Sequence, residues 1–263
     1  MKNRFTSRCC GFTLLEVLVA LSLIASISAL SFYFFISISE RHKLSLENTA
    51  IDRELHMLTD IISEDLSCII LIDKGFPAFE FKSDDEQQKF FISFFSSNNE
   101  EHITKAFQYC IGTTDNSRKI FTKLELSAAD SLFMQNTMNQ QSSLHKNFLE
   151  YAPVMVRALG GKLLNFSIRI AVKTPTGGIF ISPTNTDLTY KNGCLHYKNK
   201  EKGTVMHIKG TPLFIDITVR ALTNATEQKL SSKQFKSKRD RAIFLAAEMR
   251  KSCRRIAIRS HSF

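Results

Sequence analysis

The chain of 263 residues has no tryptophan, five prolines, ten glycines and no closely spaced cysteine pair after residue 10. That cysteine spacing argues against a CxxC redox centre and against a zinc knuckle, whose ligands lie a few residues apart. The four dispersed cysteines could form up to two disulfides, in three possible pairings, if the domain lies outside the cytosol. They are Cys68, Cys110, Cys194 and Cys253.

Sequence motifs for catalysis, cofactor binding and metal binding are also missing. The seven histidines lack the H-E-x-x-H spacing, and no series of Asp and Asn residues resembles a calcium-binding loop. Ser143 and Lys146 fit S-x-x-K, but no S-D-N element accompanies them. We therefore expect a protein that is not an enzyme, with no catalytic residues, no cofactor and no metal ligands.

Net positive charge is absent from most of the chain and is concentrated at its two ends. The net charge of +10 comes from residues 1–11, with three basic residues and no acid, and from residues 229–263, with eleven basic residues and two acids. The segment between them is nearly neutral. The terminal segments are therefore the candidates for contact with an acidic partner, anionic lipid or nucleic acid.

One long apolar run has the length of a membrane span. Residues 17–38 carry no formal charge, and neither glycine nor proline interrupts residues 12–40. About 20 apolar residues cross a bilayer as a helix. The basic residues Lys2, Arg4 and Arg8 precede it, which places the N-terminus in the cytoplasm and the body on the other side of the membrane.

A cleaved signal peptide and a plain anchor are the simpler interpretations of this run. The run is longer than the apolar region of a signal peptide and lacks a good cleavage site. A plain anchor has no use for Glu16, which stands at the start of the run. An acidic residue inside a membrane helix is costly, so it indicates a function and a partner.

Residues 11–17 read Gly-Phe-Thr-Leu-Leu-Glu-Val and follow a short basic leader. This combination resembles the processing motif of type IV pilin-like proteins, including the pseudopilins of type II secretion. The resemblance implies that a prepilin peptidase cuts between Gly11 and Phe12 and methylates the new amino group of Phe12. Thr13, Leu14 and Leu15 belong to the recognition motif. Glu16 is then expected to form an ion pair with the Phe12 ammonium of a neighbouring subunit.

The remaining sequence predicts an α+β fold of the pilin-like kind. Apolar residues recur at steps of three and four over residues 51–69, which indicates that the helix continues and packs on a head. The acidic residues Glu54, Asp60, Glu64 and Asp65 are expected on its solvated faces. The predicted organisation is a leader at 1–11, a transmembrane and assembly helix at 12–39, an amphipathic helix at 40–72, a β-rich head at 73–228 and a basic tail at 229–263.

Alternating apolar and polar residues predict strands at 164–172 and 215–221, and Asn192-Gly193 predicts a tight hairpin. Weaker strand patterns lie at 90–95, 107–111, 119–126 and 179–182. The phenylalanine-rich segment 90–95 is expected in the core, and residues 130–150 form a helix or a long loop. In the tail, the sequence is compatible with an amphipathic helix over about 239–257 or with a solvated end.

The order of these elements resembles the J class of minor pseudopilin, with Pro212–Ile217 approximating its late strand. The head is longer and lacks the tryptophan usual in that class. We expect a subunit near the tip of a pseudopilus in the bacterial inner membrane, with a periplasmic head. Its expected partners are other pseudopilins, prepilin peptidase and the inner membrane. A minor pilin of a type IV pilus or DNA-uptake system, with nucleic acid as a less favoured partner, remains open, as does a periplasmic binding or enzymatic domain on a simple anchor.

Overall fold

A computed structural model describes residues 13–71, 76–84, 89–98, 103–113, 119–139, 143–159, 162–184, 186–199, 203–235 and 237–258. The chain divides into two compact units, Met1–Glu47 and Asn48–Phe263. The first unit consists, over its described part, of the N-terminal portion of helix α1, which spans Leu14–Ser67. The second unit contains the rest of α1 and every strand.

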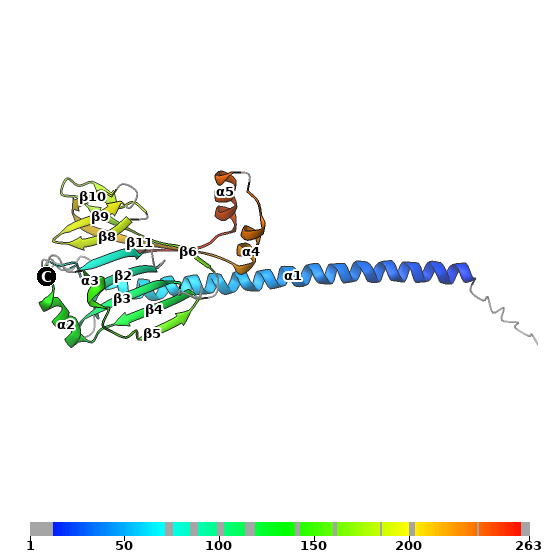
Figure 1. Ribbon diagram of the computed structural model, residues 1–263, viewed down its shortest axis with the longest axis horizontal. Coiled ribbons are helices and arrows are strands. Elements are labelled where there is room, and N and C mark those ends of the chain that lie inside the picture. The colour runs from blue at the N-terminus through cyan, green and yellow to red at the C-terminus, as the bar shows by residue number, and fades with distance from the viewer. Residues whose placement is uncertain are drawn as a thin grey trace, which may run out of the picture. The chain divides into compact units, whose positions relative to one another are not determined.

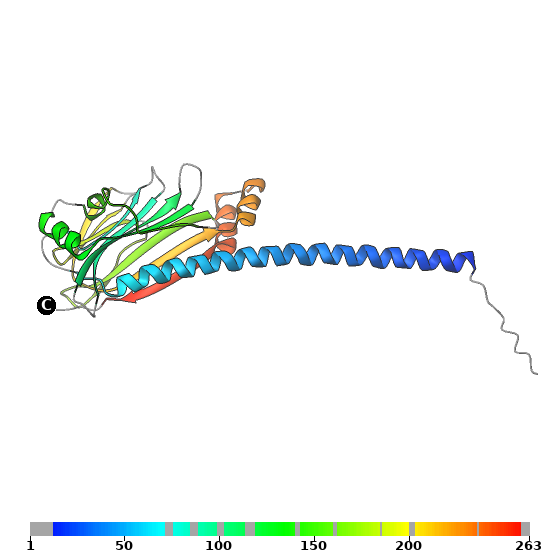
Figure 2. The ribbon, with the colours of Figure 1, turned by 90° about the horizontal axis from the view of Figure 1, so that it is seen from below.

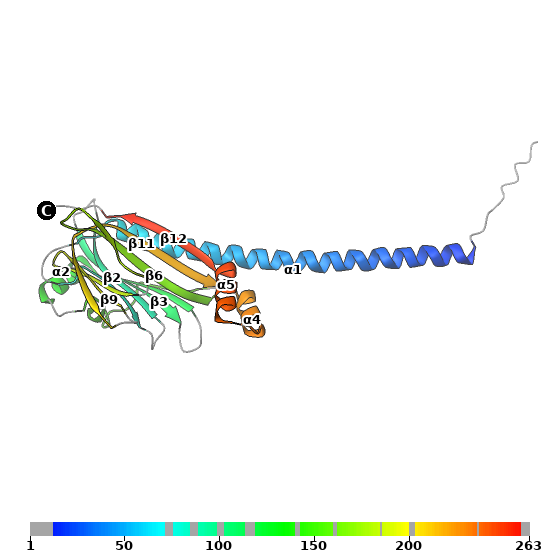
Figure 3. The same ribbon diagram turned by 90° about the horizontal axis from the view of Figure 1, so that it is seen from above.

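The second unit is built on two antiparallel sheets (Figure 1). The large sheet has the strand order β10-β9-β8-β1-β2-β3-β4-β5, and the small sheet has the order β12-β11-β6-β7, as Figure 3 shows for its first three strands. The large sheet comprises β1 (Phe79–Asp84), β2 (Lys89–Asn98), β3 (Ile103–Thr113), β4 (Lys119–Glu125), β5 (Met155–Ala158), β8 (Thr186–Lys191), β9 (Cys194–Asn199) and β10 (Val205–Lys209). The small sheet comprises β6 (Lys162–Lys173), β7 (Ile179–Ile181), β11 (Thr211–Leu222) and β12 (Arg250–Ala257).

Over the described residues, four short helices complete the fold, which confirms the expected α+β class with an apolar N-terminal helix and a β-rich head. Helices α2 (Ala128–Thr137) and α3 (Leu144–Asn147) fall in the segment for which the sequence left helix or loop open. Helices α4 (Asn224–Ser232) and α5 (Lys238–Glu248) lie between β11 and β12.

The core lies between the C-terminal half of α1 and the two sheets. The apolar stripe predicted on the helix is buried at every position: Ile51, Leu55, Leu58, Ile62, Leu66 and Ile69. Ile69 follows the end of the helix and forms an isolated β-bridge with Ser96. It packs with residues from both sheets in one cluster. The phenylalanine-rich strand β2 is buried as predicted, with Phe94 and Phe95 inaccessible to solvent.

The prediction of solvated acidic faces on α1 is wrong for Asp65, whose side chain is 19 % exposed, and it holds for Asp60, whose side chain is 51 % exposed. Asp65 accepts a hydrogen bond from the Tyr109 hydroxyl and forms an ion pair with Lys123, whose Nζ lies 2.8 Å from its Oδ2. Burial and the Asp65 charge raise the pKa of Tyr109, which stays protonated and donates. Asp60 pairs with Arg254 of β12 at 2.5 Å. These acids therefore help to fix the helix to the head.

The tail prediction is correct for α5 and wrong after it, because residues 250–257 form strand β12 in place of a helix. This strand pairs with β11 and lies along α1 (Figure 2). The Thr59 and Ser252 hydroxyls lie 3.0 Å apart in a buried contact. Ser252 and Ile256 face inward, while most of the strand's arginines face solvent. Backbone pairing with β11 and these two buried side chains therefore make this segment a strand.

Candidate functional site

The first turn of α1 is closed by a reciprocal pair of side chains, Thr13 and Glu16. The backbone N–H and the hydroxyl of Thr13 donate to Glu16 Oε2 at 2.9 and 3.1 Å, and the backbone N–H of Glu16 lies 3.3 Å from Thr13 Oγ1. The Thr13 carbonyl accepts from the N–H of Val17. This is a capping box, in which the two side chains satisfy backbone donors that the helix leaves free.

The sequence reasoning missed this cap, although the Thr-x-x-Glu signal was present in residues 13–16. The cap places the Glu16 carboxylate at the N-terminal, positive end of the helix dipole. The Glu16 carboxylate is thus held against Thr13, which directly follows Phe12 in the chain. An ion pair between Glu16 and a neighbour's Phe12 stays a prediction.

Most of the other predicted processing residues lie outside the described part of the chain. These are Gly11, Phe12 and the basic residues Lys2, Arg4 and Arg8. Leu14 and Leu15 are described, and their side chains are 84 % and 72 % exposed. The leucines of the motif are therefore available to another molecule.

An unbroken apolar surface follows the cap along α1. Every large apolar side chain from Leu14 to Ile38 is exposed to some degree, including Leu18, Ile24 and Phe32. An 18-residue window of α1 has a mean hydropathy of 2.2, which makes α1 the helix of the described chain that is long and apolar enough to cross a membrane. The surface has the character of a segment whose solvent is lipid or another apolar helix.

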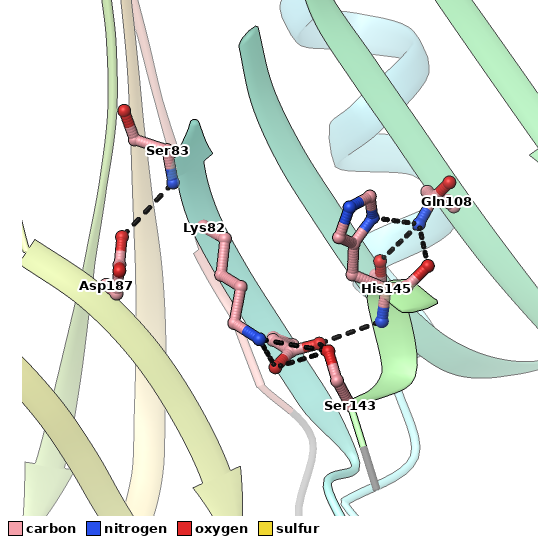
Figure 4. Close-up of polar contacts among 8 residues, drawn as sticks. Lys82, Ser83, Gln108, Ser143, His145 and Asp187 are labelled. Atoms are coloured by element: carbon pink, nitrogen blue, oxygen red, sulfur yellow. Dashed lines mark hydrogen bonds and ion pairs between the residues drawn. The ribbon is translucent and has the colours of Figure 1, made fainter. Parts of the chain in front are cut away.

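A second polar cluster surrounds the buried Glu80 of β1 (Figure 4). Ser143 donates to Glu80 at 3.0 Å, the His145 N–H donates to it at 2.8 Å, and Lys82 Nζ lies 2.7 Å from it. Lys82 also donates to Ser143 at 2.9 Å. Lys82 thus donates to Ser143 and forms an ion pair with Glu80, and the Ser143 hydroxyl in turn donates to the carboxylate and not to Lys82.

Gln108 and His145 complete this cluster. The Gln108 amide nitrogen lies 2.8 Å from His145 Nδ1, and the imidazole stacks on Phe91 with ring centroids 3.8 Å apart. Burial lowers the pKa of His145, so the ring is neutral at pH 7 and accepts at Nδ1. The cluster attaches the start of α3 to β1 and β3, which is a structural role.

Neither a metal site of three or more ligands nor a disulfide is found over the residues that the structure describes. No group of three His, Cys, Asp or Glu side chains is placed to hold a metal. Cys68, Cys110, Cys194 and Cys253 are free thiols in this structure.

Comparison with known proteins gives one match. Residues 6–32 match the model of the prokaryotic N-terminal methylation motif, which is typical of type IV pilin-like proteins. Neither a curated protein nor a solved structure matches the chain. The matched segment contains Thr13 and Glu16 and the first part of the apolar surface of α1.

Proposed function

We propose that this chain is a membrane-anchored structural subunit of a pilin-like filament. It would be made as a precursor, cut by a prepilin peptidase between Gly11 and Phe12, and methylated on the new amino group of Phe12. The observation that carries this proposal is the coincidence of the methylation motif with the capped start of a long, exposed apolar helix.

The apolar helix supplies the surface for assembly. In the membrane, lipid covers Leu14 to Ile38; in a filament, the same side chains pack against neighbouring subunits. Glu16 is the group that such packing would desolvate at high cost, unless a cation accompanies it. Cleavage after Gly11 creates that cation at Phe12. The pairing of the two charges would set the stagger between adjacent subunits.

The capping box allows the charge of Glu16 to be tested apart from its hydrogen bonds. Glutamine can replace glutamate in a capping box, so Glu16→Gln keeps the cap and removes the charge. Glu16→Ala removes both. Glu40→Gln changes an exposed carboxylate on the same helix and is the matched control.

If the ion pair directs assembly, Glu16→Gln and Glu16→Ala are both cleaved but enter filaments poorly, while Glu40→Gln assembles normally. The measurement is the amount of each variant in sheared filaments relative to membranes. Normal incorporation of Glu16→Gln would show that the cap, and not the charge, is what assembly requires.

Within the pilin-like proteins, we favour a minor pseudopilin of type II secretion, of the J class, near the pseudopilus tip. Supporting this are the amphipathic half of α1 packed on the head and strand β11, which contains Pro212–Ile217. The subunit would lie in the inner membrane with its N-terminus in the cytoplasm and its head in the periplasm. Its partners would be other pseudopilins and prepilin peptidase, and it would not act as an enzyme.

Deletion of the chromosomal gene tests this assignment against the pilus and DNA-uptake alternatives. A type II subunit is required for secretion of folded proteins, so its loss should leave those proteins in the periplasm. Normal secretion together with a loss of transformation would assign the chain to DNA uptake instead. Normal secretion and transformation with an uncut N-terminus would indicate a domain on a simple anchor.

A further inference from the structure

Two histidines face each other across the outer hairpin of the large sheet. His196 of β9 and His207 of β10 are directly opposed in the antiparallel register. Their ring centroids are 4.4 Å apart, the rings are nearly perpendicular at 75°, and the two Nδ1 atoms are in hydrogen-bonding contact. The pair contributes two ring nitrogens that converge on one point.

The state of these nitrogens makes them available as ligands. Because two Nδ1 atoms meet, one must carry a proton and the other must present a lone pair. The ring that presents the lone pair is therefore the neutral imidazole of the pair. A neutral imidazole is the form that binds a metal ion.

The position of the pair is both accessible and rigid. His207 is exposed and His196 is half-buried on the outer face of the hairpin, while the adjacent Leu195 and Tyr197 point into the core. Strand β9 is paired on both sides, with β8 and β10. The Asn192-Gly193 turn, which joins β8 to β9, has positive φ at both residues, as a type I′ hairpin requires. Sites on paired strands hold their geometry better than sites on loops.

We propose that His196 and His207 form a two-nitrogen site for one transition-metal dication, with water completing its coordination. This site is independent of the proposed filament function. Metal–nitrogen distances of about 2.1 Å in tetrahedral geometry put the two nitrogens about 3.4 Å apart. A small rotation of the two rings reaches that separation, and the ion then replaces the proton that the rings share.

The surroundings select the class of ion. Both ligands of the pair are imidazole nitrogens, and the neighbours two positions along the same face are Lys198 and Lys209, with Asp187 of β8 opposite Lys198. Calcium and magnesium require oxygen ligands, so they are excluded. Imidazole suits Ni²⁺, Cu²⁺ and Zn²⁺, and affinity should rise from Mn²⁺ through Co²⁺ to Ni²⁺.

The test is a titration of the untagged full-length chain, in detergent and freed of metal, with Ni²⁺ and Zn²⁺ by isothermal calorimetry. In His196→Ala and in His207→Ala, the affinity for one equivalent of metal should fall. Because each histidine is a direct ligand, the fall should exceed the roughly tenfold loss seen when a residue that only hydrogen-bonds a ligand is removed. His42→Ala, on an exposed part of α1, is the control and should bind as the wild type does. Unchanged binding in both hairpin variants, or equal loss in the control, would overturn the proposal.

A second measurement needs no variant, in case a substitution disturbs the edge hairpin. Diethylpyrocarbonate modifies accessible neutral histidines, and mass spectrometry locates the modified residues. We expect Zn²⁺ to protect His196 and His207 and to leave His42 reactive. Equal modification of the two hairpin residues with and without Zn²⁺ would contradict the site.

Discussion

Leu58 lies where the amphipathic half of α1 meets both sheets, and its replacement by alanine measures how far the head depends on the helix. The side chain is 1 % exposed and belongs to the main core cluster. Removing three carbon atoms loses about 2.4 kcal/mol of transfer free energy at about 0.8 kcal/mol for each. The cavity left behind brings the expected loss of unfolding free energy to about 2–5 kcal/mol.

For a unit of this size, a loss of about 3 kcal/mol should lower the unfolding temperature by roughly 6–12 °C. Thermal unfolding of the full chain in detergent, followed by circular dichroism, measures this shift. The matched control is Leu46→Ala, the same change on the same helix at a side chain that is 58 % exposed. It should change the unfolding free energy by less than about 0.5 kcal/mol. Equal shifts for the two variants would refute the packing of the helix stripe into the head.

Three further predictions concern the head, its acid stability and its charge. Gly210→Ala should destabilise the head by about 1–3 kcal/mol in urea unfolding, because an added Cβ would lie 2.5 Å from the Lys173 carbonyl oxygen. Gly178→Ala is the control, because a Cβ there has room. Hydrogen bonds from Arg255 hold the pKa of Asp216 below its usual value in the folded protein. The ion pair therefore stabilises the fold above about pH 4, and its contribution to the free energy of unfolding is lost as pH falls through the pKa that Asp216 has in the folded protein. The difference in urea midpoint between wild type and Asp216→Asn should therefore shrink between pH 6 and pH 3, and a constant difference would contradict it. Duplex DNA should not bind at physiological salt in an anisotropy titration, and binding there that weakens steeply with added salt would favour DNA uptake.

The parts of the fold with strong local patterns were predictable from the sequence. The apolar stripe at 51–69 gave the buried face of α1, and the alternation at Phe166 to Val172 and at Ile215 to Ala221 gave the two long strands of the small sheet. Asn192 and Gly193 gave the turn because few other residues adopt positive φ without strain. Each of these signals depends on residues close together in the chain.

The missed parts depend on contacts between distant residues. Strand β12 buries only Ser252 and Ile256 on its inner side, so its period-2 pattern is hidden among exposed arginines. Asp65 has the pattern of a solvated charge because its partners, Tyr109 and Lys123, lie more than forty residues away in the chain. The Thr13–Glu16 cap differs from these, because it is local and the Thr-x-x-Glu spacing alone predicts it.

The mature N-terminus tests the central claim most directly. Mass spectrometry of the N-terminal peptide, from protein isolated from membranes of the native host, identifies both the first residue and its modification. The account predicts a peptide that begins at Phe12 and carries one added methyl group on its amine. A chain that retains Met1, or one that is cut elsewhere and unmethylated, would contradict the proposal that this protein is processed as a pilin-like subunit.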